Sequence, residues 1–351
     1  MFCWHFRRIS VSRIACLLAL FTASLTAAPN LELYFIDVEG GKSVLLVSPS
    51  GQSMLFDVGW PASNNRMAST ERIVEAVQAA GLKRIDFLVI SHFDVDHMGD
   101  VPQLVAKIPV GRIFDHGDYQ TSNPQAVLRF ASYAALREKV GHTVLKVGDK
   151  VPIKGVDVQV LSASGQLIAK PLSSAGKRNA LCDTYKQQDA LASDVEDNQS
   201  IGLLITLGKF RMLDLADLEA HHSHDLVCPE NLIGTVDVYN VNVHGQFKGI
   251  APELVGALQA SVIIQANGAR KGADAQTWPV LEAAPGPRGK TKDIWQLHYS
   301  LNAGKDANPP DDFIANLEPF DGFKWIRISA TNNGTFTVTN ARNGFSKRYS
   351  K

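Results

Sequence analysis

Short apolar segments separated by turn residues follow residue 30. Strand-like patterns lie at residues 31–37, 43–48 and 53–58. Pro49-Ser50-Gly51-Gln52 separates the second segment from the third and predicts a hairpin turn, because these residue types favour turn backbone. The chain is therefore expected to begin as an antiparallel meander of three strands.

Helical and strand-like patterns then alternate along the chain. Helical spacing is found at residues 70–80, 101–107, 124–140, 252–259 and 274–283. Further strand-like patterns are found at residues 86–91, 112–115, 144–146, 156–162, 200–207, 210–215, 236–241, 262–265, 326–329 and 335–339. Residues 163–197 are polar with little periodicity, which predicts a long loop.

The repeated order of strands and helices defines the expected fold class. It predicts an α/β protein in which two sheets lie between outer helices, an αββα four-layer sandwich. No short-period repeat and no Pro- or Ser-rich linker divides the sequence. Residues 29–351 are therefore expected to form a single domain, with the long loop at about 163–197.

The first 28 residues have the pattern of a secretory signal peptide. Arg7, Arg8 and Arg13 form a positive region next to the apolar run 14–25, and Thr26-Ala27-Ala28 offers small residues for cleavage. The run is too short to span a bilayer comfortably. We therefore expect cleavage and an exported protein, periplasmic or secreted, without membrane attachment.

Charge limits the partners that this chain can bind. Cleavage after residue 28 would remove three arginines and no acid, leaving 32 basic and 35 acidic residues and a net charge of −3. The sequence has no basic tail or stripe, so no stable nucleic-acid partner is expected. Brief turnover of a phosphodiester stays open.

Two cysteines, Cys182 and Cys228, would remain after cleavage. In an oxidising compartment their even number favours a disulfide between them. Two unpaired buried thiols are the alternative.

The densest chemistry follows a buried strand pattern directly. The segment Ser91-His92-Phe93-Asp94-Val95-Asp96-His97-Met98-Gly99-Asp100 places two imidazoles and two carboxylates within six positions. These ligand types suit zinc, manganese or iron(II). Because a strand fixes the root of this loop, its side chains can converge, and a metal site is predicted at His92, Asp94, Asp96 and His97.

Two later segments supply matching ligands. Asp217 comes at the end of an apolar strand pattern, where an unpaired carboxylate would be costly. His244 also follows an apolar strand pattern. Asp214 is the competing carboxylate, expected on the opposite face or in a hydrogen bond.

These motifs resemble the metallo-β-lactamase superfamily, whose signature is His-x-[His/Asp]-x-Asp-His on a loop after a strand. Phe35-Ile36-Asp37-Val38-Glu39-Gly40-Gly41 and Leu55-Phe56-Asp57-Val58-Gly59 are similar to the first hairpins of its branch related to the hydrolase domain of the competence DNA-uptake protein. Asn198-Gln199-Ser200 and Asp217-Leu218-Glu219 continue the similarity, which extends from about Leu31 to the C-terminus.

The resemblance implies a centre of one or two ions, zinc first, with manganese or iron as alternatives. The implied ligands are His92 and Asp94 for the first site, Asp96, His97 and His244 for the second, and Asp217 as the bridge. The superfamily often has one more histidine before the bridging residue. His116 is the better pocket candidate here, and Asn198 is another, whereas His142 is expected at the surface.

The sequence departs from the branch at four positions. Asp94 stands where many members have His, Ala216 and Asp100 where Gly is usual, and Val243 where a second His is usual. These departures motivate an alternative function, an exported non-catalytic binding protein with a degraded metal site.

A metal hydrolase is nevertheless the function that the motifs favour. Bound metal lowers the pKa of its water from about 16 toward 7 and polarises the bond to be cleaved. Asp96 and Asp217 are the expected catalytic carboxylates. The expected substrate is a small molecule or phosphodiester with an ester-type bond, the phosphodiester being favoured over lactones, β-lactams and thioesters.

Overall fold

The computed structural model describes residues 1–2, 30–63, 69–119, 121–173, 175–184, 195–287, 292–319 and 324–350. Apart from Met1 and Phe2, the expected signal peptide lies outside these residues. Among the helices of the described residues, none has the length and apolar character needed to cross a membrane.

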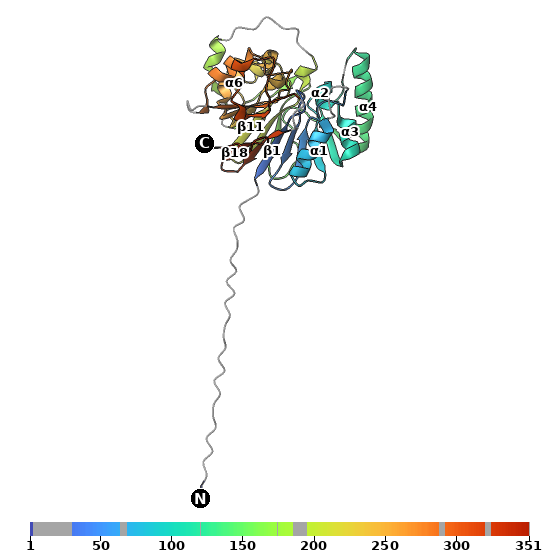
Figure 1. The fold of residues 1–351 in the computed structure, drawn as a ribbon, viewed down its shortest axis with the longest axis vertical. Coiled ribbons are helices and arrows are strands. Elements are labelled where there is room, and N and C mark those ends of the chain that lie inside the picture. The colour runs from blue at the N-terminus through green and yellow to red at the C-terminus, as the bar shows by residue number, and fades with distance from the viewer. Residues whose placement is uncertain are drawn as a thin grey trace.

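Two large sheets lie face to face with helices outside them (Figure 1). The first sheet has the strand order β19 (Ser346–Tyr349), β18 (Phe336–Asn340), β17 (Trp325–Ala330), β1 (Leu31–Ile36), β2 (Val44–Val47), β3 (Ser53–Phe56), β4 (Ile85–Val89), β5 (Val110–Asp115) and β6 (His142–Val144). The second has the order β16 (Ile314–Asn316), β15 (Asp293–His298), β14 (Val262–Gln265), β13 (Val238–Asn240), β11 (Phe210–Asp214), β10 (Gly202–Leu207), β7 (Asp157–Ala163) and β8 (Gln166–Leu167). A small third sheet pairs β12 (Glu230–Asn231) with β9 (Lys177–Arg178).

Helices pack on the outer face of each sheet. The first sheet is covered by α1 (Ser69–Ala79), α3 (Val101–Lys107) and α4 (Pro124–Val140), and the second by α6 (Pro252–Leu258) and α7 (Thr277–Ala283). Two short helices, α2 (Val95–Met98) and α5 (Ala220–Asp225), lie in connections. The 3₁₀ helices are η1 (Ala180–Thr184), η2 (Asp197–Gln199), η3 (Asn242–Gly245), η4 (Phe247–Gly249), η6 (Lys305–Ala307) and η7 (Asp311–Phe313).

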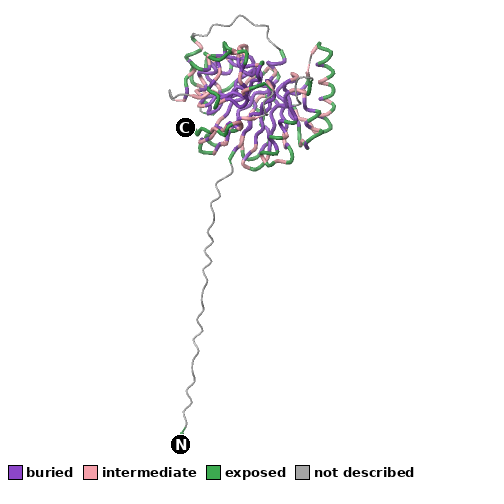
Figure 2. Tube along the Cα trace, viewed as in Figure 1, coloured by how far each residue is buried: buried purple, intermediate pink, exposed green. Residues whose placement is uncertain are grey.

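Side-chain alternation along β1 explains this layering. Leu33 and Phe35 face the core between the sheets, whereas Tyr34 and Ile36 face the core beneath the helices. Successive side chains of a strand point to opposite faces, so a strand buried on both faces must be apolar throughout. Figure 2 shows the buried residues concentrated along the sheets. The predicted αββα sandwich is confirmed.

Most predicted elements form, and most of the strands that were missed are short or polar. The exception is β15, which has six residues, four of them buried, and was not predicted. The opening meander pairs antiparallel, and β17 and β18 form the closing hairpin, which joins the first sheet beside β1. β6 lies two residues earlier than predicted. β19 was not predicted because its sequence, Ser-Lys-Arg-Tyr, forms a mostly exposed edge strand that has no apolar alternation.

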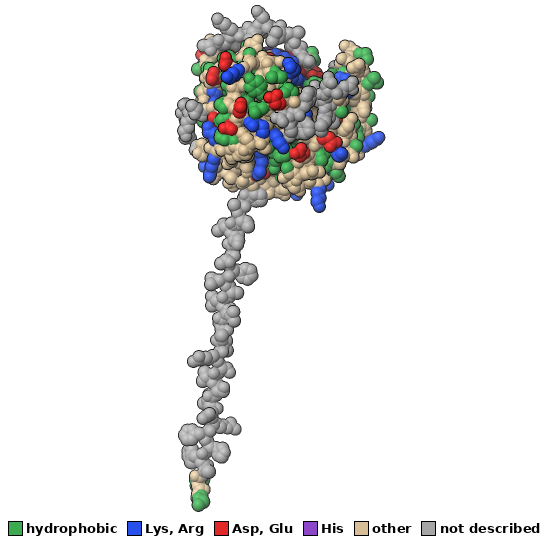
Figure 3. All heavy atoms as spheres, in the orientation of Figure 1, with side chains coloured by type: hydrophobic (Ala, Val, Ile, Leu, Met, Phe, Trp, Pro, Cys, Tyr) green, Lys and Arg blue, Asp and Glu red, His purple; other side chains and the backbone are tan. Residues whose placement is uncertain are grey.

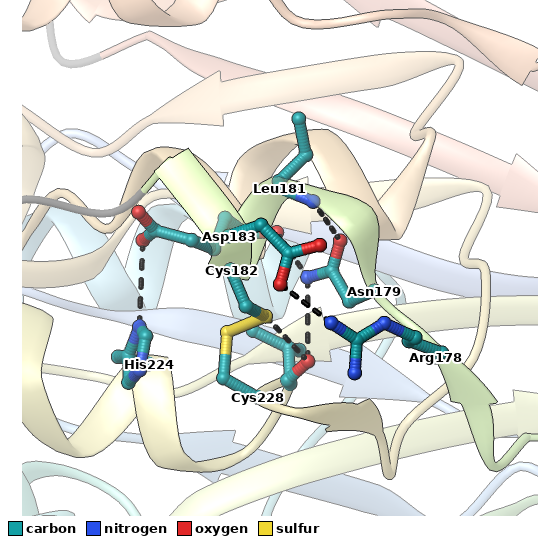
Figure 4. Close-up of a disulfide and its surroundings, with 9 residues drawn as sticks. Arg178, Asn179, Leu181, Cys182, Asp183, His224 and Cys228 are labelled. Carbon is teal, nitrogen blue, oxygen red and sulfur yellow. Dashed lines mark hydrogen bonds and ion pairs between the residues drawn. A yellow bond between two sulfur atoms is a disulfide. The ribbon is translucent and has the colours of Figure 1, made fainter.

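The segment predicted as a long loop contains short elements of its own. Its described part includes β8, β9 and η1, while residues 174 and 185–194 lie outside the described residues. Cys182 in η1 is joined to Cys228 by a disulfide, the pairing that the sequence favoured (Figure 4). The disulfide fastens this segment to the connection after α5.

The surface carries both signs of charge. On the face shown in Figure 3, acidic side chains and basic side chains are interspersed. This face therefore has no extended patch of one sign, in keeping with the small net charge.

A buried ion network ties α4 to the edge of the first sheet. Asp115 accepts hydrogen bonds from Tyr133 Oη at 2.6 Å, Arg137 Nη1 at 2.8 Å and His142 Nε2 at 2.8 Å. The prediction that His142 is a surface residue is wrong, since only 11% of its side chain is exposed. Burial alone would raise the pKa of Asp115, but the hydrogen bonds from His142 and Tyr133 and the charge of Arg137 outweigh it and lower the pKa.

We expect Asp115→Asn to lower the free energy of unfolding by about 3–5 kcal/mol at pH 7, because it removes the buried carboxylate that Arg137 contacts at 2.8 Å and leaves the exposed Asp118 and Glu138 as its ion pairs. A lowered carboxyl pKa stabilises the fold above the unfolded pKa of about 3.9, and this contribution is lost as the pH falls through the folded pKa. The difference between wild type and variant should therefore shrink below about pH 4. Urea denaturation at several pH values measures it. Asp118→Asn is the control, since Asp118 also contacts Arg137, at 3.5 Å, but its side chain is 90% exposed. An equal loss in both variants would contradict a role for burial.

Thiol titration tests the disulfide. Unfolded, unreduced protein that begins at residue 29 should contain no free thiol. Reduction should lower the free energy of unfolding by about 2–4 kcal/mol, because the cross-link restricts the unfolded chain. Two free thiols before reduction would show that Cys182 and Cys228 are unpaired.

Candidate metal centre

The candidate ligands lie on loops that follow parallel strands. His92 comes three residues after β4, Asp217 three residues after β11, and His244 in η3 after β13. β4 is parallel to β3 and β5, and β13 is parallel to β11 and β14. The Ile201 N–H donates to the Ser91 carbonyl at 2.9 Å, which joins the two sheets beside His92. The sandwich therefore brings the loops of both sheets to one place.

Asp96, His97, Asp217 and His244 converge on one point and are all buried. His97 Nε2 lies 3.1 Å from His244 Nε2, 3.4 Å from Asp96 Oδ2 and 3.3 Å from Asp217 Oδ1. His244 Nε2 lies 3.2 Å from Asp96 Oδ2 and 3.2 Å from Asp217 Oδ2. Ligand atoms around a tetrahedral zinc ion at about 2.0–2.2 Å are about 3.3–3.6 Å apart. The four side chains therefore have spacings close to those of a zinc site.

The two histidines are held with Nε2 directed into this cluster. His97 Nδ1 donates to Asp57 Oδ2 at 2.9 Å, and His244 Nδ1 donates to the Ala266 carbonyl at 3.1 Å. Neither acceptor can donate a proton, so the neutral rings present two Nε2 lone pairs to each other and to two carboxylates. A cation satisfies all four groups, and the backing hydrogen bonds are those that orient metal-binding histidines.

Protonation of His97 is the other way to offset the negative charge of this cluster. Burial alone would lower the pKa of the His97 imidazole, but the carboxylates of Asp217, Asp96 and Asp57 outweigh it and raise the pKa well above its ordinary value. The pKa of Asp217 is lowered well below its ordinary value, because His244 and His97 outweigh the effect of burial. These shifts show that the cluster attracts positive charge.

His92 forms a second group with Asp94 and Asp197. His92 Nε2 lies 3.6 Å from Asp197 Oδ1 and 4.0 Å from Asp94 Oδ2. Among the described residues, this buried nitrogen has no hydrogen-bond partner. Burial and the neighbouring His97 lower the pKa of His92 to about 3, so the ring is neutral and can bind a metal. The His92 and His97 ring centroids are 4.0 Å apart, which makes the two groups neighbours.

Sequence reasoning missed Asp197, which takes the third place beside His92. It lies in the polar stretch that was predicted to be a loop, directly before the noted Asn198-Gln199-Ser200 motif and a buried strand. Its position so close to a predicted pocket residue is the signal that could have found it. Asp217, predicted as a bridge, lies in the group with Asp96, His97 and His244. Its bridging role stays a prediction.

His116 and Asn198 have supporting positions. His116 Nε2 lies 3.0 Å from Glu196 Oε1, which also accepts the Phe93 N–H at 2.7 Å. His116 therefore holds the loop before Asp197 in place and is not part of either metal-ligand group. Asn198 donates to Glu219 at 2.9 Å and lines an open cavity of about 550 Å³ with His222, Ser164 and Asp118.

Strained backbone surrounds the centre. Residues other than glycine with positive φ include Glu39, Asp57, Ala216, Val243, His244 and Ala273. Left-handed backbone costs roughly 1–2 kcal/mol for such residues and concentrates at functional sites. Ala216 has φ 51° and Val243 has φ 49°, so both keep left-handed backbone without glycine's freedom. These two departures therefore do not prevent convergence of Asp217 and His244.

Asp100, a third departure, has a structural partner. It is buried, and its carboxylate accepts the Thr70 N–H at the start of α1, which places a negative charge at the N-terminus of the helix. Burial raises the pKa of Asp100. Asp100 thus fixes a helix near the metal loop and supplies no ligand.

A buried lysine, Lys42, contacts the carboxylate that orients His97. Lys42 Nζ lies 3.3 Å from Asp57 Oδ2 and 3.3 Å from Asp214 Oδ2, with 2% of its side chain exposed. Asn240 also donates to Asp214, at 3.0 Å. Asp214 is thus engaged in hydrogen bonds and an ion pair, as predicted. Asp57 joins this pair to His97, a role that its position after an apolar strand could have suggested.

A third group of possible ligands is already neutralised. Asp37, Glu39 and His298 approach one another. Arg72, which is 1% exposed, lies 3.5 Å from Asp37 Oδ2 and 3.4 Å from Glu39 Oε1. A guanidinium between the two carboxylates disfavours a metal ion there, and the group serves to anchor the loop after β1.

Comparisons with known proteins agree with this architecture. Residues 37–170 match the model of the metallo-beta-lactamase superfamily. Competence protein ComA from Neisseria gonorrhoeae is 44% identical over 78 residues, which are 22% of this chain and 10% of that protein. ComE operon protein 3 from Bacillus subtilis (strain 168) is 24% identical over 251 residues, 68% of this chain and 28% of that protein.

One solved structure of similar fold is YhfI from Bacillus subtilis, described as a metallo-beta-lactamase fold protein. Its TM-score is 0.45 at 11% identity, and the match covers 76% of this chain and 96% of that chain. The chain described here carries a metallo-beta-lactamase domain with homology to the two competence proteins. It spans less than a third of the length of either relative.

We expect protein reconstituted with zinc or manganese and then desalted to retain at least one equivalent of metal. His244→Gln should lose most of it, because it removes one of four converging ligands. His221→Gln is the control, since 48% of the His221 side chain is exposed and it lies in neither group at the centre. Elemental analysis measures both variants. Less than a few tenths of an equivalent in the wild type would contradict the metal centre.

Proposed function

We propose that this protein is a metal-dependent hydrolase of ester-type bonds, with phosphodiesters as the favoured substrates. The observation that supports this most strongly is the convergence of four buried ligand side chains, with 3.1–3.4 Å between their nitrogen and oxygen atoms. The two histidines already use Nδ1 elsewhere, so their Nε2 atoms are available to a cation shared with the two carboxylates. The preference for a phosphodiester comes from the resemblance to the branch of the competence DNA-uptake protein that the sequence motifs carry.

The proposed metal set has two parts. Asp96, His97, Asp217 and His244 would hold one ion, and His92, Asp94 and Asp197 would hold a second. Two imidazoles with two carboxylates favour zinc for the first ion. The second group has one imidazole and two carboxylates, a harder set that also suits manganese or iron(II).

The surrounding residues prepare the site for hydrolysis. A bound divalent metal ion acidifies water and polarises the bond to be cleaved. Asp57 and the Ala266 carbonyl fix the two imidazoles, so the ligands need little rearrangement when an ion binds. The Asp94 side chain is 37% exposed, which places it where the site opens to solvent and substrate. Asp96 would orient the attacking water.

Export is part of this proposal. The pattern of residues 1–28 supports it, and the disulfide between Cys182 and Cys228 fits an oxidising compartment. The periplasm or the extracellular medium is the proposed location.

A non-catalytic binding protein is the alternative function. Its motivation was the departures at Ala216 and Val243, yet Asp217 and His244 beside them still converge. Metal content and turnover separate the two functions, because a binding protein would hold at most one ion and turn over no substrate.

Asp217→Asn should reduce turnover by 10²-fold or more while the protein stays folded. An amide keeps the shape of the carboxylate but binds cations poorly, and the loss corresponds to about 2.7 kcal/mol of transition-state stabilisation. Metal content should fall as well. Without metal, the melting temperature should stay equal or fall moderately, because His97 and His244 then lose a carboxylate whose lowered pKa marks a favourable interaction.

Turnover of bis(p-nitrophenyl) phosphate, metal content and melting temperature are compared with and without chelator. Asp225→Asn, an exposed residue of α5, is the control and should resemble the wild type. If Asp217→Asn retains wild-type turnover and metal content, Asp217 is not a ligand, and the proposed centre is wrong.

A further inference from the structure

Two lysines reach the centre from the loops of the second sheet. Lys248 in η4 forms a short ion pair with Asp197 Oδ2 and lies 3.5 Å from Glu219 Oε1. Lys271, on the loop after β14, forms a short ion pair with Asp96 Oδ2. Each ammonium group thus contacts a carboxylate of a different proposed metal group.

These lysines are partly exposed beside the site. The Lys248 side chain is 27% exposed and the Lys271 side chain 29% exposed, and Lys271 Nζ lies 4.9 Å from the centre of the Trp60 ring. Lys42 provides the contrast, since it is 2% exposed and held between two carboxylates. A lysine with only a structural role is expected to be buried between carboxylates, as Lys42 is. Lys248 and Lys271 can instead be reached from solvent.

Both lysines present an ammonium group beside a proposed metal ligand, Lys248 at Asp197 and Lys271 at Asp96. An ammonium group that is ionised and reachable is a donor for anionic oxygens. Lys271 offers the same chemistry on the other side of the centre.

A charge count shows what these ammonium groups do when metal is bound. The carboxylates of Asp94, Asp96, Asp197 and Asp217 carry four negative charges, which two divalent cations balance. The two lysines then add two positive charges, which Glu219 and Glu196 offset in number. Glu219 and Glu196 are buried whereas the two lysines are partly exposed, so an anionic ester would meet the ammonium groups and a neutral ester would gain no such advantage.

We propose that Lys248 and Lys271 determine specificity for anionic phosphate esters by contacting the substrate's phosphoryl oxygens. This inference rests on the proposed hydrolase function and names the residues that select its substrate. The lysines bind and position the substrate, and the metal ligands remain responsible for the chemistry.

The test compares Lys248→Met and Lys271→Met in metal-reconstituted protein. Methionine keeps an unbranched side chain and removes the charge. For bis(p-nitrophenyl) phosphate, each variant should raise KM about tenfold with little change in kcat, the effect of losing one charged hydrogen bond. For neutral p-nitrophenyl acetate, kcat/KM should stay unchanged, as should metal content and melting temperature.

Lys154→Met is the matched control. Lys154 is exposed, and its carbonyl accepts a hydrogen bond from Ser50 in the turn at the other end of β2 and β3. It should behave as the wild type with both substrates. Equal losses with the anionic and neutral esters, or a loss of metal in the two site variants, would overturn the proposal, because the lysines would then support the centre itself.

Inorganic phosphate separates this proposal from the proposed function. Isothermal calorimetry on metal-loaded protein should show phosphate binding that weakens about tenfold in each site variant. If the wild type hydrolyses neither ester, the hydrolase function fails, and the calorimetry alone then decides the role of the lysines. Wild-type protein that binds no phosphate, or variants that bind it equally well, would overturn that role.

Discussion

The structure around the centre depends on one electrostatic constraint, four buried side chains whose carboxylates and imidazole lone pairs meet, with Lys271 paired to one of them, Asp96. The Nε2 atoms of His97 and His244 lie 3.1 Å apart, with carboxylates of Asp96 and Asp217 beside both. Such a cluster is costly to bury unless a cation or a proton occupies it. The backing of His97 by Asp57 and the strained backbone at Val243 and His244 make sense as the means of holding it together.

The protein separates charges that build the fold from charges that face the substrate. Lys42 and Arg137 are enclosed by carboxylates and join layers of the sandwich. Lys248 and Lys271 contact carboxylates from one side only and remain about a quarter to a third exposed. The same residue chemistry thus supports two functions, and burial decides between them. A bound metal would change the balance only for the exposed pair.

The departures from the superfamily pattern have local explanations. Ala216 and Val243 occupy left-handed backbone positions where glycine would relieve strain, but the strain leaves Asp217 and His244 in place. Asp100 accepts a backbone hydrogen bond at the start of α1. The ligand arrangement therefore persists through substitutions that suggested a degraded site.

The sequence by itself determined the layering and most of the ligands. Continuous apolar runs indicate strands buried on both faces, and the close spacing of His92, Asp94, Asp96 and His97 predicts a metal-binding loop without any tertiary contact. Polar edge strands such as β19 were missed because a strand paired at an edge needs no apolar face. Only the tertiary structure decided that Asp197 joins His92, that His116 holds Glu196, and that His142 is partly buried against Asp115. These residues lie in polar or irregular segments, and their roles come from contacts between distant parts of the chain, which no local pattern encodes.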